Sequence, residues 1–384
     1  MKYRPFGKKM NWQGSALGFG AMRLPQTSNN PADVDEAESI RMVRHAIDNG
    51  VNYVDTAYPY HAGKSEVVIG KALLDGYRQK VKLATKLPPW SVQTADDFDK
   101  ILDEQMKRLQ TDVIDLYLLH GLNNMFWPKL RDLKVFDWAE KAMASGRIGK
   151  LGFSFHDEYS LFKEIVDAYD NWTFCQIQYN YMDTKYQAGT KGLKYAAGKG
   201  LAVVVMEPLR GGSLAKKPPE AVAKIWAEAK HQHTLAEWAL LWIWEHPEVS
   251  LVLSGMSKFE QVVENLAVAE KSGPGSLTEE DFKLIERAKK AFKGTSPIPC
   301  TNCGYCMPCQ QGVEIPRIFQ LYNNGIMYDD MKTARFFYHQ AFASIPENQR
   351  ADQCIECGEC EEACPQKIPI AEWLKKVHKE LGPR

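Results

Sequence analysis

The sequence lacks the features that mark nucleic-acid-binding, secreted and membrane proteins. Its 384 residues carry no net charge, because Lys plus Arg and Asp plus Glu number 48 each. This balance disfavours a nucleic acid or an anionic membrane surface as partner. Segment 1–14 has no apolar stretch of the kind that a signal peptide needs, and no window approaches the apolar run of a membrane helix. We therefore expect a cytoplasmic protein, with neither nucleic acid nor membrane as partner.

Cysteine is nearly absent from most of the chain. Only Cys175 precedes residue 300, and eight of the nine cysteines follow it. Cytoplasmic thiols stay reduced, so clustered cysteines indicate metal ligands rather than disulfides. The composition changes at 294–299, where Gly and Pro end a charged amphipathic segment. These observations predict a large domain over 1–294 and a small one over 295–384, with Cys175 as a buried apolar side chain of the first.

Short β-branched runs alternate with longer amphipathic segments from about residue 15 to residue 271. Eight strands alternating with helices over this length predict an α/β fold, a (β/α)₈ TIM barrel. A doubly wound sheet is the alternative, but the turn after the first strand does not read G-x-G-x-x-G. The expected strands are 16–20, 51–55, 81–86, 113–120, 149–154, 174–178, 201–207 and 250–255.

Four cysteines near the C-terminus have the spacing of an iron–sulfur motif. Cys354, Cys357, Cys360 and Cys364 read C-x₂-C-x₂-C-x₃-C-P, the pattern of bacterial ferredoxins. Three thiolates at successive x₂ spacing suit three irons of one [4Fe–4S] cube, whose fourth ligand comes from elsewhere. Paired Cys₄ zinc sites are the alternative, although zinc sites rarely combine this spacing with a terminal Cys-Pro.

A second cysteine run precedes the first by about fifty residues. It has three successive x₂ spacings, so its last interval is one residue shorter, which leaves open whether Cys309 is a ligand. In two-cluster ferredoxins the last cysteine of each run binds the other cluster. We therefore predict a small, mainly helical ferredoxin-like domain with two [4Fe–4S] clusters. The predicted ligand sets are Cys300, Cys303, Cys306 and Cys364 for one cluster, and Cys354, Cys357, Cys360 and Cys309 for the other.

Chemically versatile residues stand at the carboxyl ends of three successive predicted strands. Asp55, Lys86 and His120 end these strands, and Tyr60 follows Asp55 in the next loop. In (β/α)₈ barrels, catalytic groups sit at this end of the sheet. Taken singly, Lys86 and Asp55 could be a structural ion pair and His120 a buried histidine. Their joint register favours an active site.

The sequence resembles the aldo-keto reductase superfamily over most of its length. Its cysteine-rich tail is similar to a subfamily with a fused ferredoxin-like domain. The resemblance implies an oxidoreductase that transfers hydride between a nicotinamide cofactor and a small carbonyl or alcohol substrate. The matching segments are D-T-A-Y-P-Y at 55–60, S-E at 65–66, A-T-K at 84–86, D-L-Y-L-L-H at 115–120, G-F-S at 152–154, Q-I-Q-Y-N at 176–180 and E-P-L-R-G-G at 207–212.

The resemblance also implies a role for each catalytic residue. Tyr60 would protonate the developing alkoxide, but a free phenol has a pKa of about 10. A neighbouring Lys86 ammonium is expected to lower that pKa, with Asp55 holding the ammonium in place. His120 would orient the carbonyl by a hydrogen bond. Tyr58 is a rival phenol, and the family spacing favours Tyr60.

The implied cofactor is NADP(H) or NAD(H). Ser154 and Gln176 would hold the nicotinamide carboxamide, and Lys258 could meet a 2′-phosphate. The chain departs from the family at Phe155, where Asn is usual, and at Met206, where many members stack a Tyr on the nicotinamide. The segment 261–265 could equally be an ordinary solvated helix face. The predicted cofactor contacts are Gly20, Ala21, Met22, Ser154, Gln176, Met206, Pro208, Leu209, Gly211, Gly255, Ser257, Lys258, Gln261, Glu264 and Asn265.

Three hypotheses connect the two predicted domains. Hydride carries two electrons whereas each cluster carries one, so direct exchange between nicotinamide and cluster is physically awkward. The first hypothesis is an NAD(P)H-dependent reductase whose clusters are structural or exchange electrons separately. The second adds a flavin, which would link the substrate to a ferredoxin-type electron carrier. The third is a sensing or binding protein with a vestigial barrel, and the intact set of catalytic residues argues against it.

Overall fold

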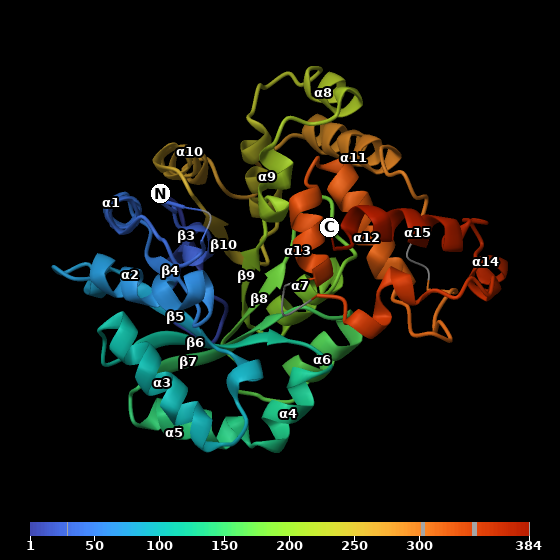
Figure 1. Cartoon of the computed structure of the whole chain (residues 1–384). Helices are drawn as coiled ribbons and strands as arrows, with labels where there is room; N and C mark the ends of the chain where they lie inside the picture. Colours follow the sequence, from blue (N-terminus) through green and yellow to red (C-terminus); the bar gives the residue numbers. More distant parts are fainter. Residues whose placement is uncertain (29, 301–303, 340–343, 384) are drawn as a thin grey trace. The chain divides into compact units, whose positions relative to one another are not determined.

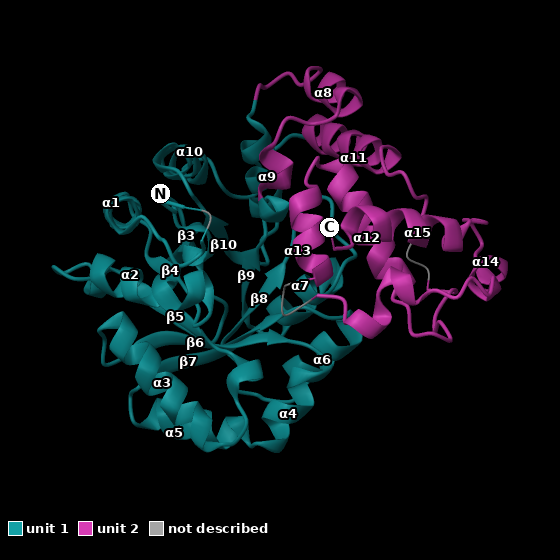
Figure 2. Ribbon diagram, viewed as in Figure 1, with its two compact units in different colours: residues 1–211, 233–278 teal, residues 212–232, 279–384 magenta. Residues whose placement is uncertain are grey.

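The computed structural model describes residues 1–384 except 29, 301–303, 340–343 and 384. The chain forms two compact units, which Figure 2 distinguishes by colour. The first comprises residues 1–211 and 233–278, and the second comprises 212–232 and 279–384. Compactness and composition are different criteria for a domain. The boundary predicted from composition, after residue 294, therefore stays a prediction.

Eight parallel strands close into a barrel in the first unit (Figure 1). They follow chain order around the barrel, and the last strand pairs with the first. The predicted (β/α)₈ barrel is therefore confirmed, and each predicted strand end lies within two residues of the observed one. The strands are β3 (Leu17–Gly20), β4 (Tyr53–Asp55), β5 (Lys82–Leu87), β6 (Ile114–Leu122), β7 (Ile148–Phe155), β8 (Phe174–Gln178), β9 (Ala202–Met206) and β10 (Val249–Gly255).

Helices that pack their apolar sides inward accompany these strands, which explains why the strands are apolar on both faces. Side chains cap the N-termini of two of these helices. At α1 (Glu36–Asp48) the Asp35 carboxylate accepts from the Glu38 amide, and at α9 (Leu235–Trp244) Thr234 and Glu237 form a capping box. Within the described residues, no helix combines the length and apolar character that crossing a bilayer requires. The helices of this unit are α1 (Glu36–Asp48), α2 (Lys64–Ala72), α3 (Asp96–Leu109), α4 (Phe126–Asp132), α5 (Val135–Ala144), α6 (Tyr159–Asp167), α7 (Gly189–Gly198), α9 (Leu235–Trp244) and α10 (Phe259–Ala269).

An N-terminal hairpin, β1 (Tyr3–Pro5) and β2 (Gln13–Ser15), packs at the amino-terminal end of the barrel. Phe6 in its loop is fully buried, 5.1 Å from Trp12 and 5.6 Å from Phe174 between ring centroids. The next residue is a glycine with positive φ, and a side chain there would lie 2.5 Å from a backbone nitrogen of β9. Apolar groups therefore fill this end of the barrel, and the polar residues collect at the other.

The second unit is mainly helical, as predicted. Its apolar core includes Ile318, Phe319, Leu374 and Val377, and several cysteines pack against that core. Its helices are α8 (Glu220–Trp226), α11 (Glu279–Gly294), α12 (Ile315–Met327), α13 (Met331–His339), α14 (Glu359–Ala363) and α15 (Ile370–Leu381). The cysteine runs stand mostly in the loops before α12 and around α14, where little regular structure restricts the chain.

Candidate active site and cysteine cavities

Lys86 is the centre of a polar network at the carboxyl end of the barrel strands. Its ammonium donates to Asp55 Oδ1 at 2.6 Å and to the Thr56 carbonyl at 2.7 Å. The Tyr60 hydroxyl lies 3.5 Å from the same nitrogen, and the Tyr60 ring meets that of His120 edge to face at 5.9 Å. The structure therefore brings all four predicted catalytic residues together, although they come from three strands and a loop.

The charged groups of this network are buried, so the pKa of each one depends on its charged neighbours. Lys86 is 1% exposed and Asp55 is 3% exposed. Burial alone would lower the pKa of Lys86, but Asp55 and Tyr60 raise it, so the ammonium stays protonated. Burial also raises the pKa of Asp55, and Lys86 opposes that rise. Removing either partner of such a buried pair typically costs about 3–5 kcal/mol of stability, because the remaining charge loses its compensation.

The pKa of Tyr60 departs from the predicted shift, whereas the pKa of His120 suits the role predicted for this residue. Burial raises the pKa of Tyr60 above its ordinary value, and Lys86 opposes the rise without reversing it. The expected net lowering by Lys86 is therefore absent, because desolvation of the phenolate outweighs the nearby ammonium. Burial lowers the pKa of His120 well below its ordinary value, aided by Lys86 and by His156. A neutral His120 is suited to hydrogen bonding with a carbonyl oxygen rather than to supplying a proton.

Tyr58, the rival phenol, faces a different part of the unit. Its hydroxyl donates to Glu104 at 2.7 Å, and the Arg108 guanidinium lies 4.2 Å from its ring centre. Burial and the hydrogen bond to Glu104 raise the pKa of this phenol. Tyr58 therefore lies against helix α3, whereas Tyr60 lies beside Lys86.

Ser154 and Gln176 lie opposite each other on β7 and β8. The Ser154 oxygen accepts from the Gly121 amide at 2.7 Å, which leaves its proton available to donate. Gln176 is 3% exposed, and its side-chain oxygen has no hydrogen-bond partner among the described residues. A buried acceptor normally has a donor, and an amide NH₂ would supply one. The pair therefore fits a carboxamide such as that of nicotinamide, with Met206 at the end of β9 two strands from Ser154.

Arg23, which the sequence reasoning did not select, lies beside two glycines of the predicted cofactor contacts. A side chain on Gly211 would lie 3.2 Å from its guanidinium, and one on Gly255 would lie 3.3 Å from its Cβ, Cγ and Cδ. Glycine at these two positions therefore gives the arginine room. Arg23 ends the 3₁₀ helix η1 (Ala21–Arg23), which directly follows Gly20 of β3. Its place directly after a strand end is the signal that could have identified it.

The remaining predicted cofactor residues have diverse surroundings. Gln261 caps its own helix, since its side-chain oxygen accepts from the amides of Ser257 at 2.9 Å and Lys258 at 3.3 Å. Asn265 is buried and donates to Ser254 at 3.1 Å. The exposed members are Met22, Gly255, Ser257, Lys258 and Glu264; the buried or half-buried ones are Gly20, Ala21, Met206, Pro208, Leu209 and Gly211.

Aromatic side chains surround His120. Trp90 lies 5.1 Å from the imidazole and Phe126 lies 6.0 Å from Trp90, between ring centres. Trp127, next to Phe126 in α4, is 1% exposed and its indole donates to Glu164. Cys175 is fully buried in β8, and burial raises the pKa of its thiol, as expected for an apolar core residue.

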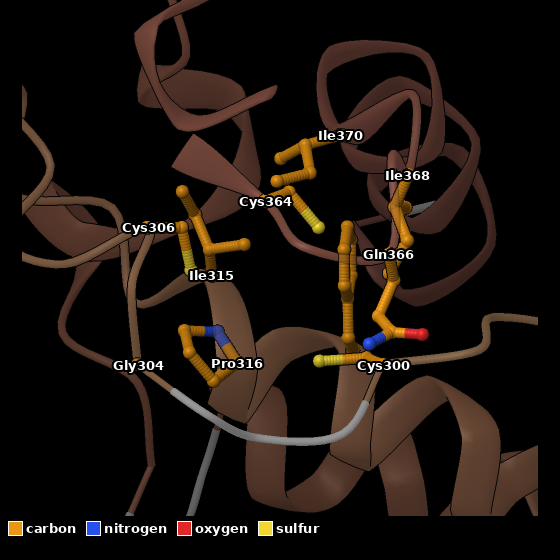
Figure 3. A pocket seen from close by; sticks show the side chains of 10 residues that line it. Cys300, Gly304, Cys306, Ile315, Pro316, Cys364, Gln366, Ile368 and Ile370 are labelled. Atoms are coloured by element: carbon orange, nitrogen blue, oxygen red, sulfur yellow. The ribbon is translucent and has the colours of Figure 1, made fainter. Parts of the chain in front are cut away.

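Cysteines from both runs line a first cavity in the second unit. Figure 3 shows Cys300 and Cys306 of one run around the same space as Cys364 of the other. Ile368 and Ile370 contribute apolar walls. This grouping agrees with the predicted exchange of the last cysteine between clusters. The fourth predicted ligand, Cys303, lies outside the described residues.

A second cavity, of about 190 Å³, is lined by Cys354, Cys357 and Cys360 and also by Cys309 and Cys306, the last of which borders the first cavity as well. Burial raises the pKa of Cys360 to about 11, and the proximity of Cys354, Glu361, Cys357 and Cys309 adds to the rise. Cys309 therefore lies beside the run that begins at Cys354, although the spacing left its role open. Among the described residues no three His, Cys, Asp or Glu side chains converge as a single-ion site requires. The thiols instead surround a cavity.

Comparison with known proteins gives the family. Residues 16–290 match the model of the aldo/keto reductase family, and residues 299–369 match that of a 4Fe-4S dicluster domain. The 6-dehydroglucose reductase of Novosphingobium aromaticivorans is 28% identical over 65% of this chain and 84% of that protein. The methylglyoxal reductase YeaE of Escherichia coli is 27% identical over 67% and 87%.

A solved structure supports the same assignment. The aldo-keto reductase AKR11C1 from Bacillus halodurans, in its holo form, matches with a TM-score of 0.62. It is 28% identical, over 75% of this chain and 96% of that one. The chain therefore belongs to the aldo/keto reductase family, as the sequence motifs predicted. It is an oxidoreductase with a TIM barrel followed by a helical 4Fe-4S dicluster domain.

Proposed function

We propose that the protein is an NAD(P)H-dependent oxidoreductase that transfers hydride between nicotinamide and a small carbonyl or alcohol substrate. The observation that carries the proposal is the buried Lys86 ammonium, which contacts Asp55 and reaches the Tyr60 hydroxyl. Relatives named as reductases of 6-dehydroglucose and methylglyoxal support carbonyl chemistry.

Tyr60 is the proposed proton donor in the direction of reduction. As hydride reaches the carbonyl carbon, the oxygen gains negative charge and needs a proton. Tyr60 donates it, and the Lys86 ammonium stabilises the phenolate that remains. Asp55 and the Thr56 carbonyl fix the position of Lys86. Neutral His120 donates a hydrogen bond that orients the substrate oxygen.

The proposed cofactor is NADP(H) or NAD(H), which supplies the hydride when bound. Ser154 and Gln176 would hold its carboxamide, and the Arg23 guanidinium would meet the diphosphate as a bidentate donor. Exposed Lys258 could pair with a 2′-phosphate, which would favour NADP(H). The other predicted contact residues stay proposals.

We further propose two [4Fe–4S] clusters, one in each cysteine-lined cavity. The clusters move single electrons, so they would serve as structural groups or exchange electrons separately with a ferredoxin-type carrier. A flavin in the barrel would instead couple the two kinds of transfer. A cytoplasmic location, with no nucleic acid or membrane partner, stays a prediction.

The test begins with protein prepared without oxygen. Its visible spectrum, iron content and released flavin are measured, followed by oxidation of NADPH and of NADH with simple aldehydes and ketones. Tyr60→Phe should abolish carbonyl reduction while the affinity for cofactor stays nearly unchanged. The matched control is Tyr58→Phe, which should keep its activity. Turnover like that of the wild type in Tyr60→Phe would refute the assignment, and released flavin would favour the coupled alternative.

A further inference from the structure

A buried histidine stands directly after the proposed proton donor. His61 follows Tyr60 in the 3₁₀ helix η2 (Tyr60–Gly63), and it is 8% exposed. The mechanism proposed above gives His61 no role, although a buried polar side chain needs partners that offset its desolvation. Its partners therefore indicate what it contributes to the site.

The imidazole of His61 binds two backbone groups from an earlier part of the chain. Nε2 lies 3.1 Å from the Leu24 nitrogen, and Nδ1 lies 3.0 Å from the Pro31 carbonyl oxygen. A backbone N–H can only donate and a carbonyl can only accept, so Nε2 accepts and Nδ1–H donates. The Gln26 side-chain amide lies 3.3 Å from Nδ1, and with its oxygen turned towards the ring it accepts from Nδ1–H as well. Both ring nitrogens therefore have partners in one neutral tautomer.

The environment of the ring favours this neutral form. Burial lowers the pKa of His61, and the carbonyls of Pro31 and Met22 oppose the lowering without reversing it. A ring that is neutral around pH 7 keeps the lone pair of Nε2 for the Leu24 amide. The hydrogen bond to Leu24 therefore persists under ordinary conditions.

The backbone after Tyr60 has a conformation that needs support. His61 and Ala62 both have left-handed backbones, with φ of 53° and 52°. This region is unfavourable for residues other than glycine, so two in succession persist only where the surrounding structure holds them. Ala62 is exposed and carries only a methyl group, so of the two side chains only that of His61 can supply this support.

Both ends of the connection made by His61 belong to the proposed site. At one end is the Tyr60 turn (60–63), whose first residue places its hydroxyl 3.5 Å from the Lys86 ammonium. At the other end is the Arg23 turn (21–24), in which Leu24 directly follows the arginine proposed to bind the cofactor diphosphate. A second bond joins the same region, since the Ser65 hydroxyl in α2 donates to the Ala21 carbonyl at 3.0 Å. The two turns are therefore held against each other.

We propose that His61 is a positioning residue that couples cofactor binding to proton transfer, because its imidazole holds the Arg23 turn and the Tyr60 turn together. This inference rests on the proposed function and adds a residue to it. Without the imidazole both turns would shift, and a small displacement of a catalytic group is costly. The affinity for cofactor and the turnover at saturating cofactor should therefore fall together.

The test uses the full chain, prepared without oxygen, with NADPH, or with NADH where the wild type prefers it. His61→Gly removes the imidazole but suits a left-handed backbone, so the turn can keep its conformation. The dissociation constant of the cofactor, measured by its fluorescence, should rise at least about tenfold. The kcat for reduction of a simple aldehyde at saturating cofactor should fall at least about tenfold.

The matched control is Ala62→Gly. It relieves the same kind of backbone strain at the next residue, at an exposed position and without removing a side-chain hydrogen bond. This variant should keep both wild-type values. Thermal melting of all variants shows whether the barrel remains folded.

A double variant tests whether the effect on cofactor affinity passes through Arg23. Arg23→Met should weaken cofactor binding by itself. When His61→Gly is added to Arg23→Met, the dissociation constant should change by less than about twofold, because residues that act through one another are not additive. A full tenfold change in both backgrounds would overturn the coupling.

A second variant serves if His61→Gly does not fold. Asparagine adopts the left-handed region more readily than most residues, and its amide can place a donor where Nδ1 stands. It has no atom where Nε2 stands, so His61→Asn loses the bond to Leu24 and should show the same joint loss.

The outcomes separate the inference from the proposed function. Wild-type values in a folded variant, or a change in only one of the two quantities, overturn the inference while leaving the proposed function intact. If the unmodified protein reduces no carbonyl compound, the proposed function fails and the inference fails with it.

Discussion

The barrel site and the cysteine cavities are two kinds of chemical site, and they differ in how far apart in the sequence their residues lie. Lys86 meets Asp55 and Tyr60 in a buried network whose members come from separate strands and a loop. Each cysteine cavity takes most of its lining thiols from one short run and the rest from the other. The barrel site therefore depends on the closure of the sheet, whereas the cavities depend chiefly on local spacing. This difference predicts that the two sites respond differently to substitution.

The largest effect should follow the loss of the buried ammonium. Lys86→Met leaves the Asp55 carboxylate buried without its partner, so we expect about 3–5 kcal/mol less stability. Carbonyl reduction should fall by about 10²–10⁴-fold, the usual contribution of acid–base catalysis. Urea unfolding and NADPH oxidation measure the two losses.

A matched substitution lies on the same strand. Lys82 also pairs with an aspartate, at 2.7 Å from Asp115, but it is 36% exposed. Lys82→Met should therefore cost no more than about 1 kcal/mol and spare the activity. Equal losses in the two variants would contradict the contrast between a buried network and a surface pair.

The next effect concerns the exchange of cysteines between the runs. Cys309→Ser combined with Cys357→Ser removes two ligands of the same predicted cluster, so about half of the iron should be lost, as in either single variant. Cys309→Ser combined with Cys364→Ser removes a ligand of each cluster, so nearly all of the iron should be lost. Iron analysis of protein prepared without oxygen distinguishes these outcomes. Equal iron contents in the two double variants would show that the ligand sets are assigned wrongly.

A smaller effect should distinguish a cysteine of the second unit from the cysteine of the barrel. Cys357→Ser should lose about half of the iron without changing the melting of the barrel, because Cys357 is exposed in the second unit. Cys175→Ser should keep all of the iron and lower the melting temperature, because it places a hydroxyl in the buried strand β8. Iron content and thermal melting are measured on the same samples. A barrel that melts earlier in Cys357→Ser would mean that the cluster stabilises it.

The smallest effect is a dependence of barrel stability on pH. Burial holds the pKa of His156 at about 4, below the ordinary value of about 6.5, so the unfolded chain binds more protons between these values. This contribution to stability is fully present above pH 6.5 and is lost as the pH falls towards 4, at up to about 1.4 kcal/mol per pH unit.

The measurement is urea unfolding at pH 7 and at pH 5. His156→Phe should reduce the dependence, whereas the control His231→Gln, at an exposed position, should not. If both variants kept the wild-type dependence, the acid sensitivity would have to arise from other groups, such as His120.

The correspondence between sequence and structure differs from one element to another. The eight barrel strands could be predicted because parallel strands covered by helices are apolar on both faces and recur at regular intervals. The hairpin of β1 and β2 could not, because its short strands carry little apolar periodicity. Its burial depends on Phe6 entering the end of a barrel that closes only in three dimensions.

The chemistry divides in the same way. Cysteine spacing and family motifs identified candidate ligands and catalytic residues, because both are written in short segments of sequence. Arg23 escaped notice, because its significance lies in what it approaches, the two glycines beside it. The expected lowering of the Tyr60 pKa also failed, since sequence shows a neighbouring charge more readily than the degree of burial.

The amino-acid sequence by itself determined the barrel and the family, and it marked the two cysteine runs, because periodicity and spacing act over short stretches of chain. Only the tertiary structure decided which polar atoms are buried, which are satisfied and which phenol meets the ammonium. The physical reason is that desolvation and hydrogen bonding depend on atoms brought together from distant parts of the chain.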